Sequence, residues 1–194
     1  MFTGIIEATA FVACAVPKGE GKRVTIATPR GWKLAKGGSV AVDGICSTVV
    51  AASRGEFEID YMPTTLKKTT ARGFRKGTVV NLERPLKYGA RVHGHFVLGH
   101  VDGRGTIKKI HDSRFMIQVP RSLMRYVAER GSITVNGIAL TVAALTGTLA
   151  TVALIPYTLS HTNLGRLKRG DRVNLEVDLL ARYGHAKKTL RKTG

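Results

Sequence analysis

One stretch of eleven residues occurs twice in this chain, and this repetition constrains the fold more than any other feature. The first copy, residues 39–49 (SVAVDGICSTV), returns 93 positions later as residues 132–142 (SITVNGIALTV). Seven of the eleven positions are identical or exchange one β-branched aliphatic residue for another. In each copy a β-branched run meets Asp-Gly or Asn-Gly and then a second such run. Because Asp, Asn and Gly tolerate positive φ, each copy predicts a hairpin with a tight turn.

The match between the two halves continues beyond this hairpin. Three further pairs of segments correspond: residues 62–66 with 155–159 and residues 77–83 with 170–176 at the same offset, and residues 4–7 with 99–102 at an offset of 95. A repeat of this length indicates duplicated domains and not a solenoid. We therefore predict an N-terminal domain over residues 1–88, a C-terminal domain over 89–178 and a basic tail over 179–194.

Short alternating segments separated by turn residues predict several antiparallel strands in each half. A half of this size has room for about six strands, which favours a small closed barrel or a sandwich. The first strand is expected over residues 2–15, and another over 95–100. Residues 120–130 are the best helix candidate, with a further helical turn or loop over 64–70 and a short amphipathic helix over 179–190.

The net charge of +18 is the unusual feature of the composition. Such a charge attracts nucleic acids, anionic membranes or small anions. No aromatic residues alternate with the basic ones as base-stacking platforms would, so we do not expect a nucleic-acid partner. No apolar window is long enough for a membrane span and no signal peptide is recognisable, so a cytoplasmic location is expected. Two cysteines confined to one half fit a reducing compartment.

Cys46, the histidines and two threonines are the residues with the most chemical potential. Cys46 directly follows the first hairpin turn, where the second copy has Ala139, and it is either a reactive thiol or a small buried hydrophobe. His93 and His95 would share one face of a strand, but fitting carboxylate or thiolate ligands are missing, so we predict no metal site. His100 follows a glycine and is better placed as a general acid or base.

Thr48 and Thr141 occupy matching positions in the two hairpins. Their presence has a purely structural explanation, because threonine favours strands. Matching hydroxyl groups in two related pockets would also suit the binding of two similar molecules.

Taken together, these motifs resemble the riboflavin synthase family of the α-chain type. The resemblance rests on the opening MFTGIIE, the duplicated hairpin, Gly94-His95 followed by GHVDG, the paired Pro-x-Thr-Leu and VNLEVD near the end. It implies an all-β fold of two tandem six-stranded antiparallel Greek-key barrels with a short C-terminal helix. It also implies a homotrimer, no cofactor and an association with lumazine synthase.

The reaction implied by the resemblance is a dismutation of two molecules of 6,7-dimethyl-8-ribityllumazine. One molecule gives a four-carbon unit to the other, which yields riboflavin and 5-amino-6-ribitylaminouracil. Each active site would form where the N-terminal barrel of one subunit faces the C-terminal barrel of its neighbour. Paired pockets suit this reaction because holding two identical heterocycles face to face is mainly an entropic problem.

The resemblance also implies the residues of two pockets. The first pocket would use Gly4, Ile5, Ile6, Cys46, Ser47, Thr48, Asp60, Tyr61, Met62, Pro63, Thr64 and Thr65. The second would use Gly99, His100, Val101, Arg130, Ala139, Leu140, Thr141, Ala153, Leu154, Ile155, Pro156, Tyr157 and Thr158. Cys46 and His100 would assist as nucleophile or acid/base, and Thr48 and Thr141 complete the expected catalytic set.

The chain departs from the family pattern inside these expected pockets. Ala139 replaces a common serine, Ser47 replaces a leucine, Thr64 and Tyr157 replace glutamates, and Arg130 replaces a lysine. Two alternatives to an enzyme therefore stay open. One is a non-catalytic relative of the lumazine-protein type that binds lumazine or flavin, and the other is a basic nucleic-acid-binding barrel protein.

Overall fold

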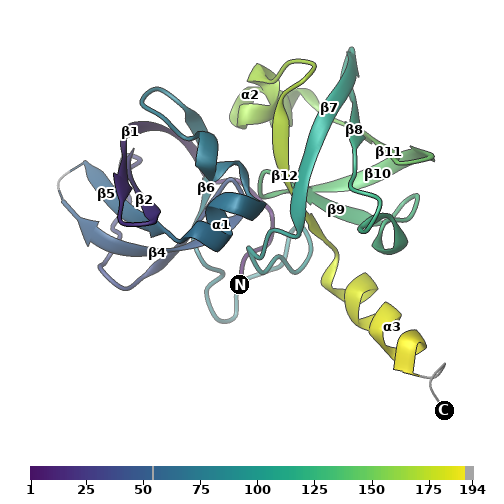
Figure 1. Ribbon diagram of the computed structural model, residues 1–194, viewed down its shortest axis with the longest axis horizontal. Helices are drawn as coiled ribbons and strands as arrows, with labels where there is room; N and C mark the ends of the chain where they lie inside the picture. Colours follow the sequence, from purple (N-terminus) through teal and green to yellow (C-terminus); the bar gives the residue numbers. More distant parts are fainter. Residues whose placement is uncertain (54, 191–194) are drawn as a thin grey trace.

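The computed structural model describes residues 1–53 and 55–190 and contains two closed antiparallel barrels side by side (Figure 1). The N-terminal barrel consists of β1 (Ala8–Lys18), β2 (Gly21–Ala27), β3 (Ser39–Val42), β4 (Ile45–Ala52), β5 (Glu56–Tyr61) and β6 (Val79–Glu83). Its strands are ordered β1-β2-β5-β4-β3-β6, and pairing of β1 with β6 closes the ring.

The C-terminal barrel repeats this topology. It consists of β7 (Gly103–His111), β8 (Arg114–Gln118), β9 (Ser132–Val135), β10 (Ile138–Thr146), β11 (Leu149–Ala153) and β12 (Arg172–Val177). The order β7-β8-β11-β10-β9-β12 is that of the first barrel, strand for strand. The prediction of two six-stranded barrels from the repeat and the family resemblance is confirmed. The division at residue 88 stays a prediction.

The duplicated stretch forms the predicted hairpin in both barrels. Strands β3 and β4 join through Asp43 (φ 47°) and Gly44 (φ 75°), and β9 and β10 join through Asn136 (φ 46°) and Gly137 (φ 82°). The two turns touch one another, since a Cβ atom added at Gly44 would lie 2.7 Å from the backbone nitrogen of Gly137. A side chain at either glycine would therefore push the barrels apart.

The contact between the barrels is made by mirrored hydrogen bonds around these turns. Asn81 Nδ2 donates to the carbonyl oxygen of Asn136, and Asn174 Nδ2 donates to that of Asp43, each at 2.9 Å. Asn163 breaks the symmetry, because its Nδ2 donates to Asp43 Oδ1 at 2.9 Å. All five residues are buried, so the duplicated Asn-Leu-Glu segments join the two halves.

Each barrel has its own apolar core, as two duplicated domains require. The N-terminal core centres on residues such as Phe57 and Ile59, and the C-terminal core on residues such as Ile107 and Ile117. The short helices α1 (Pro63–Lys68) and α2 (Pro156–His161) follow β5 and β11 at equivalent places. Of the helical turn or loop predicted over residues 64–70, the helical turn is confirmed by α1.

Three expected elements differ from what the structure shows. Residues 120–130 contain only the 3₁₀ helix η2 (Met124–Tyr126), because Val127 is extended and the chain must run on until the Arg130 N–H donates to the Val142 carbonyl at 2.8 Å. Residues 95–100 form no strand and pair only through the bridge between Phe2 and Val97. The first strand begins at Ala8 and not near residue 2.

The predicted C-terminal helix is present as α3 (Leu179–Leu190), which extends away from the C-terminal barrel (Figure 1). Arg182 anchors its first turns through an ion pair with Asp102, with the Nη2 and Oδ1 atoms 2.5 Å apart. Leu180 and Tyr183 are 71% and 65% exposed. A helix with exposed apolar side chains has a surface available for another molecule. Among the residues described, no helix is long and apolar enough to cross a membrane.

Candidate functional site

Two extended segments cross from one barrel to the other, and they build the candidate site. We call residues 2–6 the N-terminal strap and residues 95–101 the linker strap. The Ala139 N–H donates to the Gly4 carbonyl, and the Cys46 N–H donates to the Gly99 carbonyl, both at 2.8 Å. Each strap therefore lies on the barrel formed by the other half of the chain.

Apolar residues of the straps also pack on the barrel formed by the other half of the chain. Ile6 packs against the core of the C-terminal barrel, and Val101 packs against the core of the N-terminal barrel. Where they cross, the straps pair with each other, since Phe2 and Val97 exchange backbone hydrogen bonds of 2.7 and 3.1 Å.

Two carboxylates hold the straps in place. Glu83, at the end of β6, accepts the Thr3 N–H at 2.7 Å and the Gly4 N–H at 3.1 Å. Glu176 in β12 accepts the Leu98 and Gly99 N–H groups at 2.7 and 2.9 Å. Burial raises the pKa of both carboxyl groups, and the backbone hydrogen bonds oppose that increase. Each carboxylate thus satisfies strap N–H groups that have no partner in a strand.

Gly4 and Gly99 let the straps approach the hairpins closely. Both residues have left-handed backbones, with φ of 78° and 77°. A Cβ atom at Gly99 would lie 2.7 Å from Cys46 Cβ, and one at Gly4 would lie 2.5 Å from Ala139 Cβ. Only glycine both adopts a left-handed backbone without strain and leaves room for the neighbouring hairpin.

The N-terminal half-site is the surface formed by β4, the end of β5 and the linker strap. It contains Cys46, Thr48, Gly99, His100, Val101 and residues 60–65. Cys46 and Thr48 alternate with buried residues on β4 and are exposed, as is His100. Because the Gly99 carbonyl accepts the Cys46 N–H, the next residue, His100, belongs to the same half-site. The structure therefore places Cys46, Thr48 and His100 in one half-site, and their roles in binding and catalysis stay predictions.

Ser47 and Tyr61 point away from this surface and into the barrel. Their oxygen atoms lie 3.1 Å apart, and the Ser47 hydroxyl also donates to the Ile45 carbonyl. Burial raises the pKa of the Tyr61 phenol above its usual value. Ser47 and Tyr61 were both expected in the pocket, but only their backbone atoms face the half-site.

Asp60 is tied to the edge of the N-terminal half-site by two cations. Arg23 Nε donates to Oδ1 at 2.7 Å, and Lys18 Nζ lies 2.5 Å from Oδ2. The hydrogen bond from Arg23 is the main cause that lowers the pKa of Asp60 to about 2. Its carboxylate is therefore already paired, and exposed Met62 is the side chain of this segment most available to a ligand.

The C-terminal half-site is the equivalent surface on the second barrel. It contains Gly4, Ile5, Ile6, Arg130, Ala139, Leu140, Thr141 and residues 153–158. Thr141 is exposed and Ala139 is half-buried, whereas Leu140 packs against the barrel core. Tyr157 is 64% exposed and stacks on His161, with ring centroids 3.9 Å apart. This half-site is more apolar than the first and has no counterpart of the thiol.

The grouping of the strap residues expected from the sequence is wrong. Residues 4–6 were expected beside Cys46, and residues 99–101 beside Ala139, but the structure exchanges them. The cause is the crossing of the straps, which no local pattern reports. The exchange places His100 and Cys46 in one half-site.

Sequence reasoning also missed Glu83 and Glu176. The duplicated Asn-Leu-Glu was recognised as part of the repeat, but its glutamates received no role. The available signal was a charged residue inside a segment whose alternating apolar and polar residues predict a strand. His95 likewise has a structural contact, since its Nε2 lies 3.1 Å from Thr134 Oγ1, and burial lowers its pKa.

Both half-sites are open surfaces on a single chain. The side chains of Cys46, Thr48, His100 and Thr141 are exposed, and none of them lines the cavity of about 770 Å³ between the barrels. A site that must exclude water therefore needs a second surface to cover each half-site.

The comparisons with known proteins agree with this architecture. The family described as "Lumazine binding domain" matches the chain twice, over residues 3–85 and 98–178. The chain therefore belongs to the lumazine-binding-domain family, with one such domain in each barrel.

Several riboflavin synthases are among the proteins of similar sequence. The riboflavin synthase of Mycobacterium bovis is 43% identical over 192 residues, covering 94% of this chain and 96% of the relative. That of Actinobacillus pleuropneumoniae is 42% identical over 188 residues, covering 94% and 87%. The solved structure of LumP complexed with riboflavin has a TM-score of 0.83 and 26% identity, covering 91% of this chain and 99% of LumP.

Proposed function

We propose that this chain is a riboflavin synthase that converts two molecules of 6,7-dimethyl-8-ribityllumazine into riboflavin and 5-amino-6-ribitylaminouracil. The observation that carries the proposal is the pair of equivalent half-sites, one on each barrel, in a chain about 40% identical to riboflavin synthases over most of its length. Two related surfaces suit a reaction whose two substrates are the same molecule.

The chemistry needs no external oxidant or reductant, because the four-carbon unit lost by one lumazine is gained by the other. The first step is removal of a proton from the acidic 7-methyl group of one lumazine, and His100 is the side chain available as the base. Cys46, in the same half-site, would act as the nucleophile toward the second ring. Thr48 and Thr141 would hydrogen-bond one pteridine each.

We further propose that the active form is a homotrimer. Each half-site is open on one chain, and a neighbour's C-terminal half-site is the surface that matches an N-terminal half-site. The exposed Leu180 and Tyr183 on α3 support a role for this helix in assembly. The cytoplasmic location and the association with lumazine synthase stay predictions.

Turnover of purified protein tests the proposed activity. On mixing with 6,7-dimethyl-8-ribityllumazine, riboflavin absorbance should appear with one riboflavin formed for every two lumazines consumed. Tight binding with fluorescence and no product would instead identify the second candidate, a non-catalytic lumazine-protein relative. Ala139 favours that candidate, because it leaves the C-terminal half-site without the hydroxyl common in the family. Binding of nucleic acid without lumazine binding would contradict both.

A further inference from the structure

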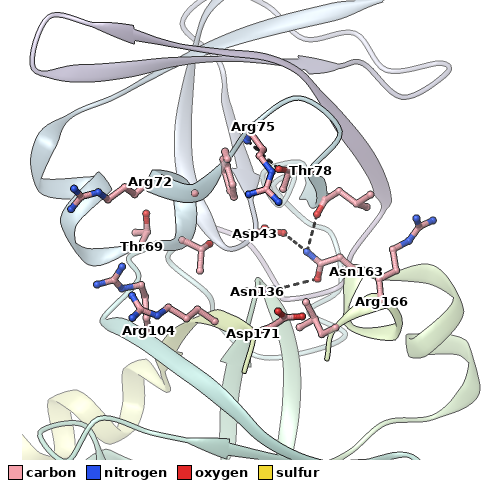
Figure 2. Close-up of a pocket in the computed structure, with 16 residues that line it drawn as sticks. Asp43, Thr69, Arg72, Arg75, Thr78, Arg104, Asn136, Asn163, Arg166 and Asp171 are labelled. Carbon is pink, nitrogen blue, oxygen red and sulfur yellow. Dashed lines mark hydrogen bonds between the residues drawn. The ribbon is translucent and has the colours of Figure 1, made fainter. Parts of the chain in front are cut away.

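A cavity lies between the two barrels, apart from both half-sites. It has a volume of about 770 Å³. Five arginines line it: Arg72 from the 3₁₀ helix η1 (Thr70–Gly73), Arg75 just after it, Arg104 from β7, Arg166 from the 3₁₀ helix η3 (Asn163–Arg166) and Arg172 from β12. Figure 2 shows the Arg75 side chain reaching toward the middle of the cavity, whereas the side chains of Arg72 and Arg166 extend to opposite sides of it. The cavity thus collects positive charge from both halves of the chain.

None of these five guanidinium groups has an ion pair or hydrogen bond with a residue that the structure describes. The two acids of the cavity are occupied elsewhere. Asp43 Oδ1 accepts from the Asn81 N–H and from Asn163 Nδ2, and Asp171 Oδ2 accepts the Lys168 N–H. Five like charges around one cavity repel each other, and no carboxylate of the described residues is paired directly with any of them.

The arginines do not follow from the internal repeat. At the offset of 93 their counterparts are other residues: Gly165 for Arg72, Lys168 for Arg75, Gly73 for Arg166 and Val79 for Arg172. The asparagines that join the barrels are duplicated. The arginines are not: two come from the N-terminal half and three from the C-terminal half, and they meet only in the folded chain. Folding of a duplicated barrel therefore does not require them.

The wall of the cavity also contains apolar side chains. Buried Phe74 and half-buried Leu167 line it beside the arginines. A lining that combines unpaired charged donors with apolar surface is typical of a small-molecule site.

We propose that this cavity binds a small anion that carries two or more linked phosphate groups. Guanidinium groups form bidentate hydrogen bonds with phosphate oxygens, and several arginines hold a phosphate chain better than a single phosphate. Five cations against Asp171 leave a formal charge of about +4, or about +3 when Asp43 is also ionised, which matches a diphosphate or triphosphate. The volume lies in the range of ligand pockets, roughly 300–1,000 Å³. Either an inorganic polyphosphate or the phosphate chain of a nucleotide has the required chemistry.

Calorimetric titration of the full chain with inorganic pyrophosphate and with ATP, at about 150 mM salt to screen general attraction, tests the proposal. Saturable binding is expected for pyrophosphate at one site per chain. Similar affinities would indicate that the phosphate chain alone is recognised, and tighter binding of ATP that the nucleoside also contacts the cavity. Phenylglyoxal labelling with peptide mass spectrometry should show that pyrophosphate protects Arg75 and Arg166 but not Arg30.

A pair of matched variants separates the site from the overall charge. Arg75→Gln with Arg166→Gln removes two charges from the cavity, and Arg30→Gln with Arg121→Gln removes two exposed charges elsewhere. The first pair should weaken pyrophosphate binding by ~10-fold or more, and the second by less than about twofold. Lumazine turnover should be unchanged in both. Equal weakening in the two pairs, no saturable binding, or binding of nucleic acid but of neither small anion would overturn the proposal.

Discussion

At the scale of single residues, the proposed chemistry depends on Cys46 and His100. They come from different halves of the chain, and the hydrogen bond from the Cys46 N–H to Gly99 holds them in one half-site. Neither has a counterpart in the other half-site, where Ala139 and Ile5 occupy the equivalent positions. The two half-sites are therefore equivalent in shape but not in chemistry.

Replacing either residue should abolish most of the turnover. His100→Ala and Cys46→Ala should each lower kcat by ~100-fold or more, the usual loss for an acid/base group, while the unfolding free energy changes little because both side chains are exposed. Cys14→Ala and His111→Ala are matched controls, since both side chains are exposed outside the half-sites. Wild-type rates in the first two variants would contradict the site assignment.

Ala139→Ser should raise kcat. The new hydroxyl would face the C-terminal half-site beside Thr141, and a hydrogen bond present only in the transition state is worth ~10- to 1000-fold. Steady-state turnover of lumazine is the measurement, with exposed Ala143→Ser as the control on the same strand. An unchanged rate would mean that another residue of this chain already supplies the missing interaction.

Asp43→Asn should make stability less dependent on pH. Burial raises the pKa of Asp43 to about 7, against the hydrogen bonds from Asn81 and Asn163. The folded chain keeps a proton that the unfolded chain releases above pH ~4, so the unfolding free energy should fall between about pH 4 and pH 7. Asparagine already stands at the equivalent position of the second barrel, as Asn136. Because it does not titrate, its presence at position 43 should remove this loss of stability.

Urea unfolding across this pH range measures the effect. The variant should be more stable than the parent at pH 8 by on the order of 2–4 kcal/mol, with the difference shrinking toward pH 4. A difference that stays constant with pH would show that Asp43 is not the group that titrates.

At the scale of elements, the straps decide how the half-sites are assembled. A strap is neither helix nor strand, and its backbone hydrogen bonds go to a hairpin on one side and to a buried glutamate on the other. This geometry leaves no room for a side chain at Gly99. The backbone of the linker strap is therefore positioned by close contact with the hairpin as well as by hydrogen bonds.

Gly99→Ala should therefore cost more than an equivalent change elsewhere. Gly89 has nearly the same φ, 76°, but open space around it. Gly89→Ala should destabilise by about 1 kcal/mol through backbone strain alone. Gly99→Ala should lower the free energy of unfolding by a further ~1–3 kcal/mol, because the added methyl group clashes with Cys46. The same variant should also lower lumazine turnover. Equal unfolding free energies for the two variants would contradict the close approach of the linker strap.

At the scale of the whole molecule, assembly should depend on α3. A chain that ends at Asp178 loses the Arg182 ion pair and the exposed apolar residues of the helix. It should sediment as a monomer and lose turnover, because no neighbour then covers the half-sites, while both barrels stay folded. A chain that ends at Leu190 should keep both the assembly and the turnover. A trimeric and active chain without α3 would contradict the proposed assembly.

The sequence by itself determined two duplicated antiparallel β domains, since the duplicated hairpins, their turn residues and the alternation of apolar positions are local patterns that repeat. The choice of closed six-stranded barrels over sandwiches came from the family resemblance. The sequence also determined Cys46, Thr48, His100 and Thr141 as the candidate residues. The tertiary structure decided the rest. The exchange of the straps, the roles of Glu83 and Glu176 and the gathering of five arginines join residues far apart in the chain, and such contacts follow only from how the two closed barrels pack against each other.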